Sequence, residues 1–511
     1  MRTLLSIALS ALIAFFLVGC GSKGSGFDDG GADGGENDGT VNPDGCFGFE
    51  CADTGVPGDA GCVGLQCQQT CPTTGISGTV YDPAGINGLY NVYVYVPNTA
   101  LAPIADGPVC TACQAPASGN PVVSATTDYT GHFSIPNAPV GQNIPLVLQL
   151  GKWRRHLTIS NVASCVDNPQ PDKSLRLPKK QHETSPDDNI PLIAMTTGCD
   201  GAECFFMSRI GLDSSEFTGS NGTGRVRIYK SVNDDGQTFP NMKTGALTAQ
   251  QLWSTPGEML KYDIVFDACE CSTYDRGGYG GTDVGYKNFL DYINKGGRAF
   301  ATHYFYNFFA SNTQCGGSSF EACAGQNPLP TVGAWYGNQF LADQPAQCPK
   351  NSTLTLGGTC LNIDTAIPKG QAFADWYKNN NGKLTEGGGE NKGYIGLTDI
   401  REDMGKLDQN LVNAGTATPW LYAHGTSTFP SNYDAYYFSI NTPVSTNPTN
   451  QCGRAIYSDV HLAEAPTGSF PGYCQNPNSS DHAPNELALE FLFFDLASCV
   501  QNDTQPPIIP N

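Results

Sequence analysis

Four side chains have the types and positions from which an acid–base or metal centre could be built: Glu270, His303, Asp459 and His461. An imidazole titrates near neutral pH, so a histidine can take up and return a proton in one catalytic cycle. Carboxylates beside it can transfer a proton themselves or bind a metal ion. We therefore take these four as candidate catalytic residues. The sequence requires no cofactor and assigns no residue to a metal.

The elements that must position these side chains have the pattern of buried parallel strands, which are short apolar runs ending at turns. They alternate with helical patterns, as expected for a flavodoxin-like α/β domain with a parallel sheet over residues 187–500. Ligands of such sheets bind beyond the carboxyl ends of the strands, where we expect the four candidates and Cys269 to meet. The predicted strands cover 190–195, 224–229, 262–268, 298–302 and 455–459.

Three segments of this domain resemble the class I glutamine amidotransferase-like superfamily: YDIVFDACE, FLDYINKGGRAFATHYFYNFF and CGRAIYSDVHLAE. The GGxxxxxH pattern of its trehalose-utilisation type is matched by Gly296, Gly297 and His303. True amidotransferases place a nucleophilic cysteine at the turn from strand to helix, where this chain has Thr302 and His303. We therefore do not expect glutamine hydrolysis by that mechanism. Residues 312–420, rich in Gly, Asn and Cys, look like an insertion.

The N-terminus indicates export. Arg2 precedes an apolar run from Leu4 to Val18, which is too short for a stable membrane span. The sequence Leu17-Val18-Gly19-Cys20 resembles the lipobox of bacterial lipoproteins, and an ordinary secretory signal is the alternative. The resemblance implies a signal peptide over 1–19 and lipidation of Cys20. Because no aspartate follows Cys20, the family's sorting rule favours the outer membrane of the bacterial cell envelope, on its periplasmic or surface face. Residues 20–45, rich in Gly and Asp, predict a flexible tether.

Charge and cysteine content limit the partners and the compartment. Twenty-seven basic residues against 48 acidic ones give a net charge of −21, so nucleic acid is not an expected partner. Twenty cysteines favour an oxidising compartment and a disulfide-rich segment over 46–72. Disulfides are also preferred over zinc for the CxxC of Cys110 and Cys113. Removing Cys20 leaves 20 − 1 = 19 cysteines; Cys269 or Cys271 could be the odd thiol, although a disulfide to a distant cysteine is preferred.

Residues 73–180 have short strands at the spacing of a small antiparallel β-sandwich. Four motifs resemble the carboxypeptidase regulatory-like, transthyretin-like domain. That family is mostly an accessory or carbohydrate-binding-like fold without catalysis, so we nominate no active site here. We expect turns at Asp82 and Gly131 and a core position for Phe133. In order, the motifs are Gly78-Thr79-Val80-Tyr81-Asp82, Val92-Tyr93-Val94, Thr127-Asp128-x-x-Gly131-x-Phe133 and Pro139-x-Gly141.

The C-terminus predicts a helix over 486–496 that packs one apolar stripe on the sheet, followed by a disordered tail over 501–511. Two functions are compatible with the whole pattern. The preferred one is a non-enzymatic envelope protein, membrane-attached through its lipid anchor, that binds glycan or envelope partners through the sandwich and a degenerate amidotransferase-like domain. The alternative is an exported hydrolase of carbohydrate-like substrates that uses Glu270, His303 and His461, with or without a metal.

Overall fold

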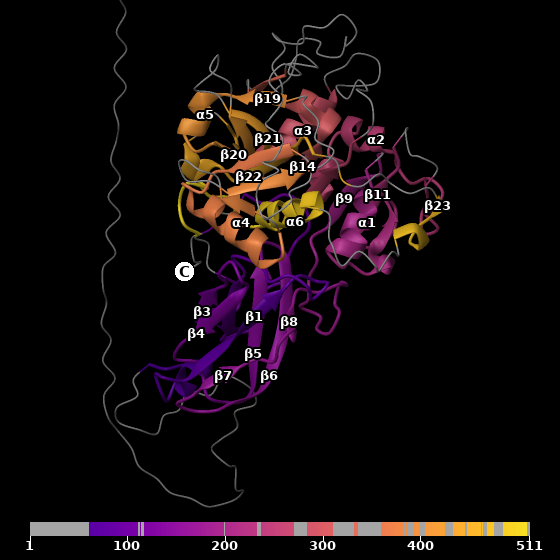
Figure 1. Cartoon of the computed structure of the whole chain (residues 1–511). Helices are drawn as coiled ribbons and strands as arrows, with labels where there is room; N and C mark the ends of the chain where they lie inside the picture. Colours follow the sequence, from indigo (N-terminus) through magenta and orange to yellow (C-terminus); the bar gives the residue numbers. More distant parts are fainter. Residues whose placement is uncertain are drawn as a thin grey trace, which may run out of the picture. The chain divides into compact units, whose positions relative to one another are not determined.

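The computed structural model describes most of the chain from residue 61 to residue 507, all within one compact unit, Phe49–Asn511 (Figure 1). The predicted signal peptide, the tether and Cys20 lie outside the described residues. No described helix has both the length and the apolar character to cross a membrane. The gaps within the described range are 111–112, 114–116, 199, 232–236, 270–283, 310–331, 336–358, 383, 387–392, 398–403, 425–432, 445–446, 461, 463–467 and 475–483.

The N-terminal part of the described chain forms the predicted small β-sandwich from two four-stranded sheets. One sheet is wholly antiparallel, and in the other the two shortest strands run parallel to the first strand. The first sheet contains β1 (Gly75–Tyr81), β4 (His132–Ile135), β7 (Asp167–Pro169) and β8 (Leu175–Arg176). The second contains β2 (Tyr93–Pro97), β3 (Pro121–Thr126), β5 (Gly141–Leu150) and β6 (Trp153–Val162).

The three sandwich residues with predicted structural roles have those roles. The Asp82 carboxylate accepts hydrogen bonds from the backbone N–H groups of Ile86 and Asn87, which fixes the turn after β1. Gly131 has φ +81°, and a Cβ there would lie 2.7 Å from the carbonyl oxygen of Val80. Only glycine therefore fits this turn without strain. Phe133 is buried in the core.

The main sheet is mixed, so the prediction of a parallel sheet is correct for only one half. Among the described residues it has 13 strands. The parallel half, in spatial order, is β10 (Phe217–Gly219), β11 (Val226–Tyr229), β9 (Ile193–Thr196), β13 (Ile264–Asp267), β14 (Arg298–Thr302) and β22 (Gly453–Ser458). The antiparallel half continues through β21 (Tyr433–Thr442), β20 (Ala417–His424), β16 (Thr359–Ile363), β18 (Gly393–Leu397) and β17 (Leu384–Glu386).

The predicted insertion, 312–420, supplies much of the antiparallel half. Its strand β16 pairs with β20 on one side and with β18 on the other. Two further strands, β15 (Gly333–Trp335) and β19 (Met404–Leu407), pair with each other, and β19 also joins β21. The described part of this segment therefore extends the main sheet. A separate short pair is formed by β12 (Gln237–Thr238) and β23 (Gly468–Ser469).

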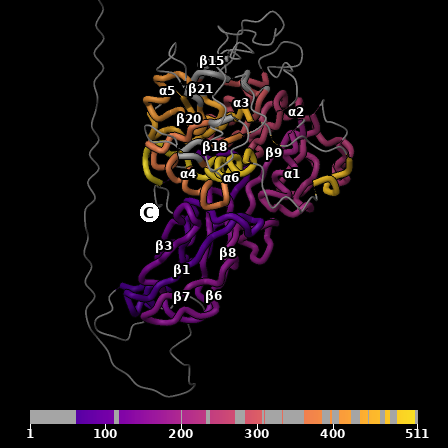
Figure 2. The backbone as a smooth tube through the Cα atoms, in the orientation of Figure 1, coloured from indigo at the N-terminus to yellow at the C-terminus, as the bar shows by residue number. Residues whose placement is uncertain are grey.

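The C-terminal helix α6 (Pro484–Ala497) contacts both the sandwich and the main sheet. Figure 2 shows it beside α4 (Pro368–Asn379). Almost every α6 residue is buried, so the prediction of a single apolar stripe is wrong, because apolar partners surround the helix. The other described α-helices are α1 (Ala202–Cys204), α2 (Ala249–Ser254), α3 (Val284–Asn294) and α5 (Gln409–Asn413), and η2 (Phe205–Arg209) is a π-helix.

The sandwich and the α/β part share one hydrophobic core. Tyr90 of the sandwich stacks on Phe491 of α6, and the Trp376 side chain of α4 donates a hydrogen bond to the Gly88 carbonyl. Disulfides reinforce this junction, since both cysteines of the CxxC bond to the α/β part, which excludes the zinc interpretation. The described disulfides are Cys62–Cys67, Cys71–Cys165, Cys110–Cys452, Cys113–Cys499 and Cys204–Cys474.

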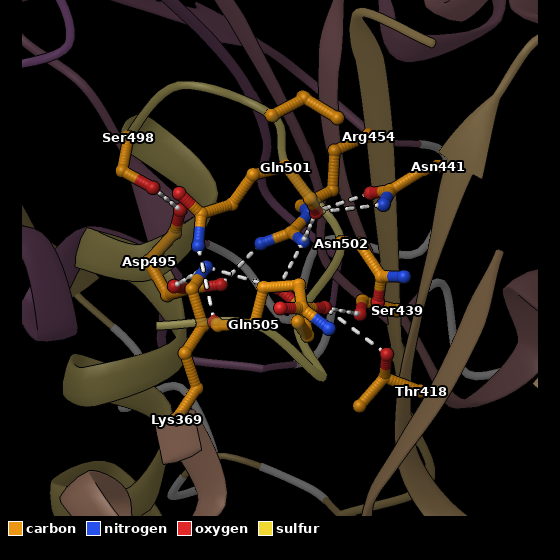
Figure 3. A network of polar contacts seen from close by, with 12 residues as sticks. Lys369, Thr418, Ser439, Asn441, Arg454, Asp495, Ser498, Gln501, Asn502 and Gln505 are labelled. Carbon is orange, nitrogen blue, oxygen red and sulfur yellow. Dashed lines mark hydrogen bonds and ion pairs between the residues drawn. The ribbon is translucent and has the colours of Figure 1, made fainter. Parts of the chain in front are cut away.

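A buried network of two cations and two carboxylates holds the C-terminal segment against the fold (Figure 3). Lys369 Nζ lies 2.7 Å from Asp495 and 2.9 Å from Asp503. The Arg454 guanidinium pairs with the same two carboxylates. The hydroxyls of Thr418 and Ser439 donate to the second oxygen of Asp503. Each charge is therefore paired, as burial requires.

The prediction of a disordered tail from residue 501 is wrong for residues 501–507, which the structure describes. Asp503 is only 1% exposed and belongs to the network. Gln501 is also buried, and its backbone carbonyl accepts a hydrogen bond from Asn441. The Pro-rich composition suggested a solvated segment because it did not reveal the buried partners of Asp503.

Candidate functional site

The carboxyl ends of four parallel strands, β9, β13, β14 and β22, meet at one edge of the main sheet. The pairing brings Phe266 beside Phe300, and Thr302 beside Ser458, at the ends of neighbouring strands. The residues that follow these strands must therefore be neighbours in space. This is the edge at which open α/β sheets bind ligands.

A thiol and an imidazole face each other at this edge. Cys269 follows β13, and His303 follows β14 as the first residue of the 3₁₀ helix η5 (His303–Phe308). The Cys269 Sγ lies 3.1 Å from the His303 Nδ1, within hydrogen-bonding distance. Cys269 is 0% exposed and His303 is 6% exposed. We call these two residues the thiol–imidazole pair.

The backbone of His303 is fixed from the neighbouring strand. Its φ of +39° is unusual for a residue other than glycine and places it at a sharp turn between β14 and η5. The hydroxyl oxygen of Tyr457, on β22, lies 2.6 Å from the His303 carbonyl oxygen and 2.6 Å from Asp459 Oδ1. Tyr457 thus connects His303 with Asp459.

The position of Cys269 is set from β9. The backbone N–H of Ala268 donates a hydrogen bond to the Thr196 hydroxyl, 2.9 Å away. Gly198 has φ +53°, and a Cβ there would lie 2.1 Å from the Cys269 carbonyl oxygen. Glycine at 198 therefore permits the close approach that places the thiol opposite the imidazole.

The structure brings two of the four predicted catalytic residues together. His303 and Asp459 are linked through Tyr457, whose hydroxyl oxygen lies within hydrogen-bonding distance of an oxygen of each residue. Glu270 and His461 lie outside the described residues, so their predicted positions stay predictions. The preferred disulfide for Cys269 is wrong, because this residue is a buried thiol beside His303.

Cys269 and Tyr457 are the site residues that sequence reasoning did not nominate as catalytic. Cys269 immediately precedes Glu270 at a predicted strand end, and this position could have indicated that Cys269 belongs to the site. The expectation of export favoured a disulfide for Cys269 instead. Tyr457 lies inside an apolar strand pattern, where a tyrosine is usually a core residue, so the pattern contained no sign of its hydrogen bonds.

The arrangement fits nucleophilic chemistry, because a histidine within hydrogen-bond reach of a thiol can take its proton and release the thiolate. A metal role has less support. The residues described in the structure include one group whose ligand atoms lie within 4.8 Å of one another: Glu203, Cys204 and Cys474. Because Cys204 and Cys474 form a disulfide, their sulfurs are not thiolate ligands.

The chain matches no protein-family model, and no curated protein sequence is significantly similar to it. The functional argument therefore rests on the geometry of the site.

Proposed function

We propose that this protein is a lipid-anchored, exported hydrolase whose nucleophile is Cys269 and whose general base is His303. The observation that carries this proposal is the 3.1 Å distance between Cys269 Sγ and His303 Nδ1 at the carboxyl edge of the sheet. Nucleophile and base at hydrogen-bond distance are the diagnostic arrangement for covalent catalysis. The substrates in this proposal are esters or amides of carbohydrate-like envelope components.

The proposed reaction passes through a thioester. The thiol proton moves to His303 while the sulfur attacks the carbonyl carbon, and the bond from that carbon to the leaving group breaks. The proton on His303 then goes to the leaving alcohol or amine. Water then attacks the carbonyl carbon of the thioester and gives a proton to His303. The carbon–sulfur bond breaks, the acid is released, and His303 returns the proton to the sulfur.

The test uses p-nitrophenyl acetate as a generic ester, followed by intact-mass analysis of the folded full-length protein. We expect a burst of p-nitrophenol and the addition of one acetyl group on Cys269. Cys269→Ser should lose the acetylation, and His303→Asn should slow it by about 100-fold or more, which is the usual contribution of a general base. His132→Asn, on an exposed position of β4, is the matched control and should behave as the unmodified protein does.

A second candidate function is favoured by the burial of the pair, because a substrate cannot reach a thiol that is 0% exposed unless neighbouring segments move. In this proposal the protein is not an enzyme, and it binds glycan or envelope partners through the sandwich and the α/β domain. Absence of acetylation at Cys269, together with hydrolysis that is equal in the unmodified protein and both site variants, would reject the hydrolase and favour the binding protein.

The proposed lipid anchor needs its own measurement. We expect the full chain, expressed in a bacterium with an outer membrane, to fractionate with membranes and to incorporate a radiolabelled fatty acid. Cys20→Ser should abolish the labelling and release the exported protein from the membrane fraction, because acyl chains provide the attachment. Cys67→Ser, which removes a described disulfide instead, is the control and should leave the labelling intact. Equal labelling of both variants would contradict the anchor.

A further inference from the structure

A cavity of about 470 Å³ lies where the sandwich meets the amino ends of the parallel strands. Ile264 and Arg298, at the starts of β13 and β14, line it, whereas Cys269 and His303 follow the other ends of the same strands. The cavity is therefore separate from the thiol–imidazole pair. Its volume falls within the range of small-molecule binding sites.

The wall of the cavity is fixed before any ligand arrives. Described residues between 104 and 118, among them Val109, Cys113 and Ala117, form one side, and two disulfides, Cys110–Cys452 and Cys113–Cys499, connect this loop to the α/β part. Lys152 Nζ adds a hydrogen bond of 2.8 Å to the Ala105 carbonyl oxygen in the same loop. A preformed wall favours binding, since little ordering has to occur when a ligand enters.

The charges on this wall do not cancel. Lys152 pairs with Asp263, at 2.5 Å. Arg298 donates only to backbone carbonyls, those of Gly296, Cys452 and Ser498. No carboxylate in the described part of the chain pairs with Arg298. Burial, with the positive charge of Arg454 nearby, lowers the pKa of Arg298 to about 10. Two cations and one anion line the cavity, which leaves one positive charge for a ligand to neutralise.

The rest of the wall is mainly apolar. Ile104, Val109 and Pro191 contribute aliphatic surface, and Tyr93 contributes an aromatic ring. We propose that this cavity binds a small monocarboxylate with an apolar body, whose carboxylate pairs with Arg298. The four carbonyl contacts of Arg298 leave one N–H of Nη2 for a charge-assisted hydrogen bond to the carboxylate, and the apolar body removes hydrocarbon surface from water. This binding site is independent of the proposed hydrolase.

The test measures the binding of sodium octanoate and of 1-octanol to the full chain by calorimetry and thermal denaturation. We expect saturable binding of octanoate and an increase in Tm, since a ligand specific to the native state stabilises it. Arg298→Gln should weaken octanoate binding by about 10-fold or more and leave octanol binding nearly unchanged. Arg227→Gln, a half-buried arginine of β11 outside this wall, is the matched control and should bind octanoate normally.

A second variant keeps the proposal testable if Arg298→Gln does not fold. Ala117→Trp should fill the cavity from the loop side while it preserves every hydrogen bond of Arg298, and we expect it to abolish octanoate binding. Absence of octanoate binding to the unmodified protein would overturn the proposal. Binding that neither variant weakens would also overturn it, because the fatty acid would then occupy another apolar surface.

Discussion

Asp503→Asn is expected to lower the free energy of unfolding by about 3–5 kcal/mol, the usual effect of removing one partner from a buried ion-pair network. The variant keeps the side-chain volume but leaves Lys369 and Arg454 with one carboxylate, Asp495, between them. Although burial alone would raise the pKa of Asp503, the charges of Arg454 and Lys369 hold it well below its ordinary value. The ionised form is therefore the one that stabilises the fold. Urea denaturation at neutral pH measures the difference.

The matched control lies one residue away. Thr504 is exposed, and its hydroxyl donates a hydrogen bond only locally, to Asn502. Thr504→Ala should change the free energy of unfolding by less than about 0.5 kcal/mol, as surface substitutions usually do. A chain that ends at Val500 should lose at least as much stability as Asp503→Asn. If Asp503→Asn and Thr504→Ala had equal effects, the network would not hold the C-terminal segment.

Stability should also fall as pH rises toward 8, because of a carboxyl group buried at the junction of the sandwich and α6. Glu490 Oε2 lies 2.8 Å from Arg209 Nε and accepts a hydrogen bond from Asn87. Burial raises the pKa of Glu490 to about 8, against the attraction of Arg209, and the neighbouring Asp82 carboxyl raises it further. Two carboxyl groups, those of Glu490 and Asp82, therefore lie near one arginine, Arg209.

The sign of the pH effect follows from proton uptake. Between the ordinary pKa of 4.5 and the native value of about 8, the folded protein keeps a proton on Glu490 that the unfolded chain has lost. The stabilisation from Glu490 is complete at pH values below 4.5, the ordinary pKa. It is lost as the pH rises through about 8, the pKa in the folded protein. At about 1.4 kcal/mol per pKa unit, this shift corresponds to a loss of up to about 5 kcal/mol of unfolding free energy.

Glu490→Gln isolates this contribution. We expect the variant to lose much less stability than the unmodified protein between pH 5 and pH 8.5, measured by urea denaturation at each pH. Burial also raises the pKa of Glu203, to about 7, but this group is present in both proteins and its effect cancels in the difference. Asp291→Asn, at an exposed position of α3, should follow the unmodified protein. Parallel pH curves for Glu490→Gln and the unmodified protein would contradict the prediction.

The strands of the parallel half could be predicted because buried strands need continuous apolar sequence. The run of residues 262–268 and the run of 298–302 contain β13 and β14, so both carry that signal. The antiparallel half was not recognised, since its strands come from a Gly- and Asn-rich segment whose composition indicated an insertion. Burial of α6 on all sides was also hidden, because the sequence does not show that the sandwich covers its outer face.

The sequence predicted the location of the candidate site, at the carboxyl edge of the sheet, better than it predicted which residues form the site. His303 and Asp459 were nominated because each ends or follows a strand, and strand ends meet at one edge. The contact of Cys269 with His303 joins positions 34 residues apart on different strands, so it depends on sheet register, which a single sequence does not give. The same limit applies to Asp503, whose cations lie 134 residues away at Lys369 and 49 residues away at Arg454.

The two disulfides that fix the cavity loop also constrain the order in which the chain can mature. Cys110 and Cys113 are synthesised early, but their partners, Cys452 and Cys499, follow 342 and 386 residues later. In the export that we propose, these two thiols with CxxC spacing would be together in an oxidising compartment during that interval. A disulfide between Cys110 and Cys113 would have to be broken by thiol–disulfide exchange before the native disulfides could connect the sandwich to the α/β part. If the protein is exported as we propose, we expect formation of its native disulfides to depend on a disulfide isomerase more than on an oxidase alone.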